Sequence, residues 1–196
     1  MRFSERLFGR ETSSPGDDLI AWLEDKSIDD RRFISGTLFG GPHSLRVLKW
    51  VLTRPDCDKG TAAMLLWEFG MPHALIKDDK RPAVLREVQL ELLELILSRW
   101  RSGLFADAIF EFDPRENAKI YRRELKKKGL KGADPLDLPE ELWQPIKGRR
   151  PVSNDATAVT LESPVGALLD QLRLADMAKI NPEVWEPIRK RALGLD

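Results

Sequence analysis

The fold of this chain is decided by residues 44–70, which read Ser44-Leu-Arg-Val-Leu-Lys-Trp-Val-Leu-Thr-Arg-Pro-Asp-Cys-Asp-Lys-Gly-Thr-Ala-Ala-Met-Leu-Leu-Trp-Glu-Phe-Gly70. Pro55 ends a first helix, and Asp58 stands where a second helix needs a residue to cap its N-terminus. The spacing predicts two amphipathic helices joined by a short acidic turn. The apolar stripe of the first helix consists of Leu45, Leu48, Val51 and Leu52.

Helical patterns of the same kind continue on both sides of this stretch. We expect an all-α fold, a compact bundle of about eight helices in which two-helix hairpins of the HEAT type are one allowed arrangement. Residues 1–16 are expected to be an N-terminal arm and residues 17–196 a single helical domain. Residues 104–112 fit either a short helix or an extended segment, and we expect a helical turn. Further helices are predicted from Asp17 or Asp18, over 27–39 and 82–101, from Asp113-Pro114 to Lys128, over 140–147, from Ser163-Pro164 and from Asn181-Pro182.

One short sequence occurs twice near the C-terminus. Residues 139–147 and 182–189 share the frame Trp-x-Pro-Ile followed by a basic residue, at a separation of about 42 residues. This separation is close to the period of two-helix solenoid repeats. Two copies do not make an array, because such repeats bury their apolar faces only by stacking three or more units. Two short helices that each dock a tryptophan are the simpler interpretation.

The composition argues against several classes of protein. Basic and acidic residues number 32 each, so a neutral chain has no overall field to draw it onto nucleic acid or an anionic membrane. The sequence contains neither a secretory signal at its start nor the roughly 18 consecutive apolar residues of a membrane span. Its single cysteine, Cys57, excludes an internal disulfide framework. We therefore expect a cytoplasmic protein with no membrane segment.

The turn Asp56-Cys57-Asp58 and the two histidines are the candidates for chemistry. A helix N-terminus lowers the pKa of a thiol, whereas neighbouring carboxylates raise it, so Cys57 is either a reactive thiolate or a small buried apolar residue. If the two central helices are antiparallel, His43 and His73 lie at the same end of the pair. A metal-dependent or hydrolytic enzyme using His43, His73 and the 56–58 turn is thus an alternative function, although no known metal-binding or nucleophile motif supports it.

A basic segment runs from Lys119 to Lys131 and contains seven cations and one acid. It is a candidate patch for phosphate or for an acidic partner, which leaves a nucleic-acid-binding accessory protein as a second alternative. Four acids follow at once and are expected to neutralise it, so we expect no nucleic-acid binding. These acids are Asp134, Asp137, Glu140 and Glu141. The candidate patch residues are Arg122, Arg123, Lys126 and Lys127.

Six tryptophans are many for a chain of this length. Trp50 and Trp67 fall beside the apolar stripes of the central helices, so partial exposure is one interpretation, and packing between helices is the commoner one. Rigid aromatic rings that remain accessible commonly anchor protein interfaces. Trp50, Trp67, His73 and Asp56 are therefore the candidate partner-binding residues.

Residues 50–72 resemble the core of a small bacterial domain family of unknown function, whose motif is Pro-x-Cys-Asp-x-Gly-Thr-Ala followed by an apolar run, Trp and Gly-x-Pro. The aromatic stretch that often precedes this core in the family is replaced here by residues 39–43. The resemblance implies a helical bacterial module and supplies no catalytic residue; relatives look like accessory or immunity-type proteins. The matching positions are Pro55, Cys57, Asp58, Gly60, Thr61, Ala62, Trp67, Gly70 and Pro72.

These observations together predict a non-enzymatic, bacterial, protein-binding module. An immunity protein that neutralises a toxin is one form of this prediction. No catalytic residue, metal ligand or cofactor is expected.

Overall fold

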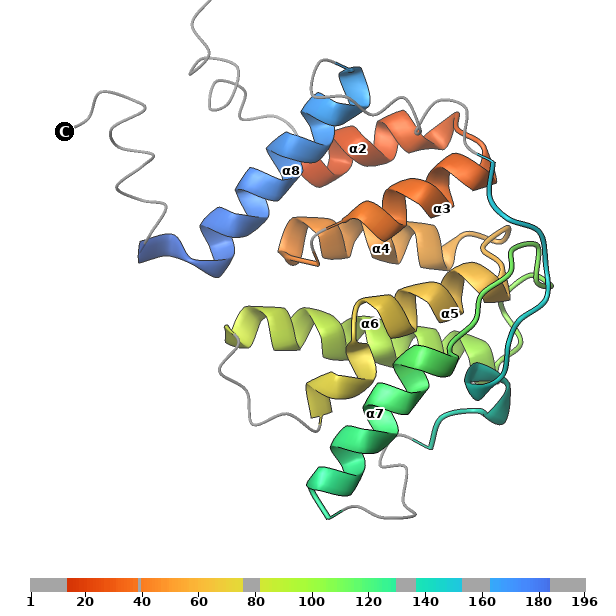
Figure 1. Cartoon of the computed structure of the whole chain (residues 1–196). Helices are drawn as coiled ribbons and strands as arrows, with labels where there is room; N and C mark the ends of the chain where they lie inside the picture. The colour runs from red at the N-terminus through yellow and green to blue at the C-terminus, as the bar shows by residue number, and fades with distance from the viewer. Residues whose placement is uncertain (1–13, 39, 76–81, 130–136, 153–162, 184–196) are drawn as a thin grey trace, which may run out of the picture.

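The computed structural model describes residues 14–38, 40–75, 82–129, 137–152 and 163–183. Within these ranges all regular elements are helices, and the β-type pairings are isolated bridges, so the all-α class is confirmed (Figure 1). The helices are α2 (Pro15–Glu24), α3 (Ile28–Thr37), α4 (Pro42–Thr53), α5 (Lys59–Glu68), η1 (Met71–Leu75), α6 (Ala83–Arg101), α7 (Arg115–Lys127), η2 (Glu140–Trp143) and α8 (Pro164–Ile180), where η denotes a 3-10 helix.

Several helices begin at side chains that accept hydrogen bonds from the first turn. The Ser14 hydroxyl accepts from the backbone N–H of Asp17, whose carboxylate bonds back to Ser14, so α2 begins at Pro15 rather than at Asp17. Ser27 caps α3 in the same way, and Asp58 caps α5. The expected arm, residues 1–16, therefore contains the start of α2, and residues 1–13 lie outside the described ranges.

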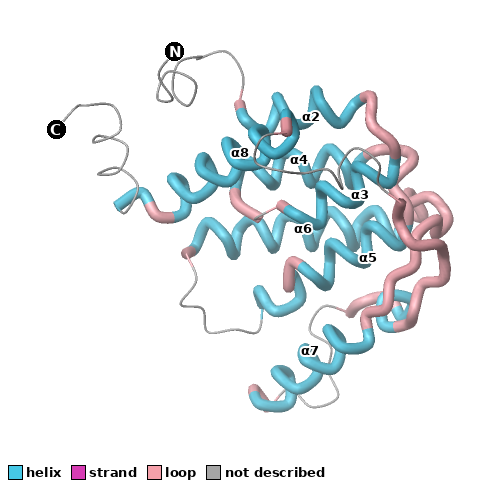
Figure 2. Tube along the Cα trace, turned by 45° about the horizontal axis from the view of Figure 1, so that its top comes forward, coloured by secondary structure: helices cyan, strands magenta, loops and turns pink. Residues whose placement is uncertain are grey.

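The two central helices pack mainly against other elements rather than against each other. The principal neighbours of α4 are α2, α6 and α8, whereas α5 packs against α3, α6 and η1. The stretch 44–70 thus forms two helices joined by a turn, as expected, but it is not a self-contained hairpin. Helix α7 contacts the other helices mainly through α5, and both ribbon views show it at one edge of the molecule (Figures 1 and 2).

Helix α5 is enclosed on all sides, and residues 60–67 are all buried. Small residues in its first turns allow this enclosure, because they let neighbouring backbones approach closely. A Cβ atom on Gly60 would lie 2.0 Å from the carbonyl oxygen of Phe110, so the close neighbour at this point is the 105–112 segment and not α4. An interior helix of this kind has no exposed side on which a tryptophan could remain accessible.

Residues 104–112 are extended, so the expected helical turn is wrong. Their backbone groups pair with distant segments: Ala106 donates to Cys57 and accepts from Lys59, and Phe112 exchanges hydrogen bonds with Ile146. These partners replace the local hydrogen bonds that a helix would make. Position 148 also needs a glycine, since its Cβ would lie 2.4 Å from the Phe110 carbonyl carbon.

The first Trp-x-Pro-Ile copy is not the helix expected over residues 140–147. Only the single 3-10 turn η2 forms, and residues from Gln144 to Arg149 run alongside the 109–112 segment. Pro145 lacks an N–H, and Ile146 and Arg149 use theirs to bond Phe112 and Ile109. Most of the second copy lies outside the described residues.

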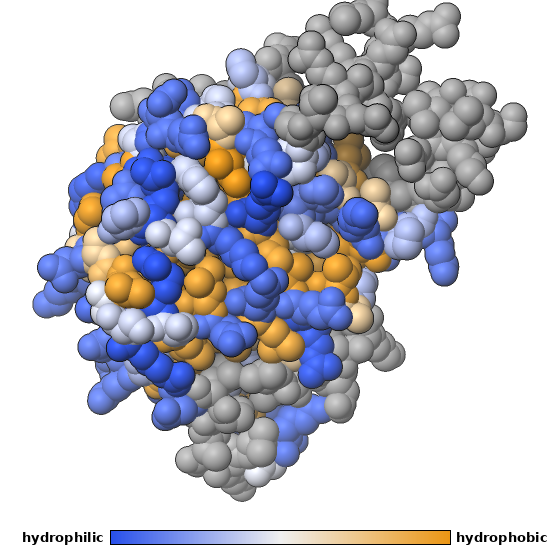
Figure 3. Space-filling model, turned by 180° about the vertical axis from the view of Figure 1, so that it is seen from behind, coloured by the Kyte–Doolittle hydropathy of each residue, from blue (hydrophilic) through white to orange (hydrophobic). Residues whose placement is uncertain are grey.

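Seen from behind, the surface shows apolar side chains across its middle, framed by hydrophilic ones (Figure 3). Apolar atoms contribute more than half of the surface of ordinary folded proteins, so this distribution by itself identifies no site. None of the helices in the described ranges has the length and apolar character needed to cross a bilayer.

Candidate functional site

The first turn of α3 carries four consecutive charged residues, and all four are buried. Asp29, Asp30, Arg31 and Arg32 have between 4% and 8% of their surface exposed. Buried charges are costly unless each has a partner, so their partners define what this region does. Asp30 belongs to the cap of α3, because its carboxylate accepts from the Ser27 hydroxyl at 2.6 Å.

Asp29 forms a two-pronged ion pair with Arg149. Both Nη atoms of Arg149 lie 2.6 Å from the two carboxylate oxygens, and the backbone N–H of Val152 donates to the same carboxylate. The hydrogen bonds from Arg149 hold the pKa of Asp29 below its ordinary value, although burial acts in the opposite direction. The pair ties the C-terminal end of the 144–152 segment to α3.

Arg32 connects three parts of the chain. Its guanidinium donates to the Thr61 hydroxyl at 3.2 Å and to the Glu111 carbonyl at 3.0 Å, and its Cζ lies 5.0 Å from the centre of the Phe110 ring. The Arg149 guanidinium lies 4.8 Å from the same ring. Burial lowers the pKa of Arg32, and the charge of Asp58 opposes that shift. Two cations against one ring stabilise the crossing of the extended segments.

Arg31 links the buried cluster to the surface. It donates to Asp56 at 2.5 Å, and Asp56 also accepts from Nε of Arg54 at 3.1 Å. The Arg54 guanidinium in turn lies 4.8 Å from the centre of the Trp50 ring, and Trp50 is half-buried. We call Trp50, Arg54 and Asp56 the Trp50 surface. Two of the four predicted partner-binding residues, Trp50 and Asp56, are therefore brought together by Arg54.

Asp58 is fully buried and holds four backbone N–H groups. Its carboxylate accepts from Gly60 and Thr61 in the first turn of α5, and from Ile109 and Phe110 in the extended segment. The sequence predicted the two bonds that cap α5, because they are local. The other two bonds make Asp58 the junction between α5 and the 105–112 segment.

Cys57 has the environment of an inert thiol. The residue is buried, and burial raises its pKa to about 12, with a further contribution from the charge of Asp58. A thiol with this pKa is protonated at neutral pH and is a poor nucleophile. Of the two interpretations of Cys57, the structure therefore favours the buried apolar residue.

The proposed convergence of histidines on the 56–58 turn is wrong for His43. His43 lies at the start of α4 and the turn follows its end, and the 12 residues of this helix span about 18 Å. The side chain of His73 lies outside what the structure describes. The backbone N–H of His43 donates to the carboxylate of the buried Asp176. In the described part of the chain, no group of three His, Cys, Asp or Glu side chains comes close enough to hold a metal ion.

Trp67 packs between helices, the commoner of its two interpretations, and only 2% of its surface is accessible. Its indole N–H donates to the Leu142 carbonyl at 2.9 Å, and its ring meets Tyr121 and Trp143 edge-on at 6.0 and 5.4 Å. The physical reason is the enclosure of α5, which leaves even residues beside its apolar stripe in the interior. Trp67 joins α5 to α7 and η2, and it is not available to a partner.

The predicted basic patch lies on the outer side of α7. Arg122, Arg123, Lys126 and Lys127 are all exposed, while Tyr121 and Leu125 face the core. Residues 130 and 131, at the end of the predicted basic segment, lie outside the described ranges. Arg122 stacks over the Trp143 ring at 4.7 Å from its centre.

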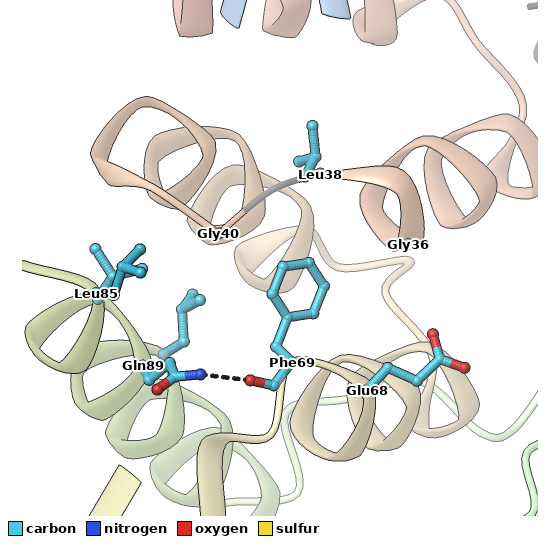
Figure 4. Close-up of a pocket in the computed structure, with 9 residues that line it drawn as sticks. Gly36, Leu38, Gly40, Glu68, Phe69, Leu85 and Gln89 are labelled. Atoms are coloured by element: carbon cyan, nitrogen blue, oxygen red, sulfur yellow. Dashed lines mark hydrogen bonds between the residues drawn. The ribbon is translucent and has the colours of Figure 1, made fainter. Parts of the chain in front are cut away.

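A groove of about 290 Å³ lies between the C-terminal ends of α3 and α5 and the first half of α6 (Figure 4). Phe69 and Leu85 line it together with glycines at positions 36 and 40, and Gln89 donates to the Phe69 carbonyl at 2.6 Å. Its apolar lining contains one carboxylate, that of Glu68. None of the predicted site residues lines this groove.

Comparisons with protein-family models, with curated proteins and with solved structures find no match for this chain. The function must therefore be argued from the residues and their geometry.

Sequence reasoning missed the buried charges of α3 and the role of Asp176. In the sequence, the run Asp29-Asp30-Arg31-Arg32 resembles the solvent-exposed first turns of an ordinary helix. Its partners Arg149, Asp56 and Thr61 lie between 25 and 120 residues away, so no local spacing could have indicated them. A run of four charged residues in a short helix does not by itself indicate burial, and the burial becomes evident only from the contacts in the folded structure.

Proposed function

We propose that this chain is a protein-binding module and that the Trp50 surface is its contact site. The observation that carries the proposal is the contact series in which Trp50 supports Arg54, Arg54 bonds to Asp56, and Asp56 is anchored by the buried Arg31. The ring and the guanidinium are therefore held in place before a partner arrives, which reduces the entropy lost on binding.

Tryptophan and arginine are the residue types that dominate the energy of protein interfaces. Other cations also lie over half-buried tryptophan rings: Lys26 lies 4.7 Å from the centre of the Trp22 ring, and Arg122 lies 4.7 Å from the centre of the Trp143 ring. Lysine is depleted at interfaces and arginine enriched, which favours Trp50 over Trp22. The Trp50 surface is preferred to Trp143 because Arg54 also bonds to Asp56, which the buried Arg31 anchors. The resemblance of residues 50–72 to a family with immunity-type relatives favours a toxin as the partner.

The test is co-purification of a stoichiometric partner from the source organism, followed by its affinity for variants. Trp50→Ala and Arg54→Ala are expected to weaken binding by about tenfold or more, which is the size of a hot-spot effect. Trp50→Phe keeps most of the packing and separates lost contact from lost folding. Trp22→Ala is the matched control, because it removes a half-buried tryptophan under a cation elsewhere. Equal losses for Trp22→Ala and Trp50→Ala, or no partner at all, would contradict the proposal.

A further inference from the structure

Helix α7 concentrates positive charge on one side of a chain whose basic and acidic residues balance overall. At 100° per residue, its cations fall within an arc of about 140°, which Glu116 shares. The opposite flank packs on the protein through Ala118, Tyr121 and Leu125. We call this arc the cationic stripe, and its members are Arg115, Lys119, Arg122, Arg123, Lys126 and Lys127.

Two of the acids expected to neutralise the stripe, Asp137 and Glu141, contact α6 instead. Arg101, at the end of α6, donates to the Asp137 carbonyl at 3.0 Å and lies 3.8 Å from its carboxylate. The Glu141 carboxylate accepts from the Trp100 indole at 2.7 Å. Asp137 and Glu141 therefore lie beside α6. This weakens the expectation that the following acids neutralise the basic segment and prevent nucleic-acid binding.

Local ion pairs occupy only part of the stripe. Arg115 bonds to Asp113, Lys119 lies 3.9 Å from Glu116, and Lys127 lies 3.1 Å from Glu124. Exposed pairs of this kind contribute about 1 kcal/mol or less and exchange easily for other anions. Arg123 and Lys126 have no hydrogen-bond or ion-pair partner among the described residues.

The character of the stripe fits phosphate groups better than a protein surface. Protein interfaces are built around an apolar or aromatic centre from which charges are depleted. The stripe's own residues include no apolar or aromatic side chain; Ile120, 42% exposed, stands at its margin, and the half-buried Trp143 ring lies under Arg122. A helix of 13 residues is about 20 Å long, which corresponds to about six phosphates along one strand of a duplex. The edge position of α7 leaves this length accessible (Figures 1 and 2).

We propose that the cationic stripe of α7 binds the phosphate backbone of a nucleic acid without sequence preference. This activity is separate from the Trp50 surface and does not depend on it. If Arg123, Lys126 and Lys127 each contact one phosphate, the logarithm of affinity falls against the logarithm of salt with a slope of about −2.7. Between 50 and 200 mM salt this corresponds to a weakening on the order of 40-fold.

The experiment uses the full chain and a fluorescein-labelled 12-base-pair DNA duplex, with binding followed by anisotropy. Arg123→Gln combined with Lys126→Gln is expected to make the salt slope shallower by about two, because two phosphate contacts are removed. Arg86→Gln with Lys179→Gln is the matched control, since both residues are exposed on other helices and the same charge is lost. The control is expected to keep the original slope, and Trp50→Ala is expected to keep duplex binding.

Three results would overturn the proposal. The first is no binding to the duplex at 50 mM salt, and the second is an equal loss in the control pair, which would indicate diffuse attraction rather than a stripe. The third is binding to poly-glutamate without binding to the duplex, which would assign α7 to an acidic protein partner. Arg123 and Lys126 are exposed, so their replacement is expected to leave the fold intact. Circular dichroism of each variant checks that the helix content is unchanged.

Discussion

Asp58 and Asp176 are both fully buried and both hold the N-terminus of a helix, but they reach it in different ways. Asp58 directly precedes α5, the helix that it caps. Asp176 belongs to α8 and accepts from His43 and Ser44 in the first turn of α4, more than 130 residues away. A helix N-terminus can therefore be capped by any buried carboxylate that the fold places beside it. Only a carboxylate that is adjacent in sequence produces a recognisable sequence pattern.

Each aspartate also has a glycine beside it that makes room. The N-cap residue of α4 is Gly41, which has no side chain to bond the first turn, and a Cβ there would lie 2.4 Å from Cγ of Asp176. Gly60 does the same for Asp58 and the Phe110 carbonyl. The two sites differ in what they join, because Asp58 connects a helix to an extended segment and Asp176 connects two helices. The predictions below test whether this difference matters for stability.

The largest effect is expected for Asp58→Ala. The change leaves four backbone N–H groups without their acceptor in a buried place, and their combined cost is about 5 kcal/mol of unfolding free energy. For a chain of this size the melting temperature would fall by about 15 °C. Asp58→Asn, which keeps one acceptor oxygen, is expected to lose roughly half as much. Asp107→Ala changes an exposed aspartate of the same segment and is the control. A loss below about 1 kcal/mol for Asp58→Ala would show that water replaces the carboxylate.

Gly60→Ala comes next, with an expected loss of about 3 kcal/mol. Alanine normally stabilises a helix relative to glycine, but here its Cβ would lie 2.0 Å from a backbone oxygen that cannot move freely. Gly36→Ala in α3 is the matched control, since its Cβ would meet only Met64 at 3.6 Å, an ordinary contact. Thermal unfolding should show opposite signs for the two changes. If Gly60→Ala left the stability unchanged, the Phe110 backbone would have to be free to move away from the first turn of α5.

Local signals predicted the parts of this fold that are held locally. Capping and breaking residues predict the cap at Asp58 and a helix over 82–101, and the structure confirms both, with Pro82 as the N-cap residue of α6 rather than its first helical residue. Residues 104–112 were mispredicted because their partners are residues 57–59 and 146–149, far away in sequence. The sequence left two interpretations of Trp67 open, because the enclosure of α5 depends on α7 and η2, which follow it by many residues. The prediction that His43 converges on the 56–58 turn is wrong because helix α4 separates them.

Asp176→Ala is expected to cost about 3 kcal/mol, less than Asp58→Ala, because it leaves two backbone N–H donors without their acceptor instead of four. Chemical denaturation measures the difference, and Asp170→Ala on the same helix is the control. Gly41→Ala alone is also expected to destabilise, because its Cβ would press on Asp176. The double variant Gly41→Ala/Asp176→Ala should lose less stability than the sum of the two single losses, because the carboxylate that obstructs a Cβ at position 41 is then gone. Full additivity would contradict the contact.

The smallest effect is expected for Ser44→Ala, which separates the two kinds of bond that Asp176 makes. The Ser44 hydroxyl donates to the Asp176 carboxylate at 2.5 Å, and the Ser44 backbone N–H donates to the same oxygen at 3.1 Å. Removing the hydroxyl leaves both backbone donors of α4 with their acceptor, so the loss should be about 1 kcal/mol. If Ser44→Ala costs as much as Asp176→Ala, the hydroxyl rather than the helix N-terminus is what Asp176 holds. In that case the comparison with Asp58, which binds backbone N–H groups, would fail, because only Asp58 would act as a true cap.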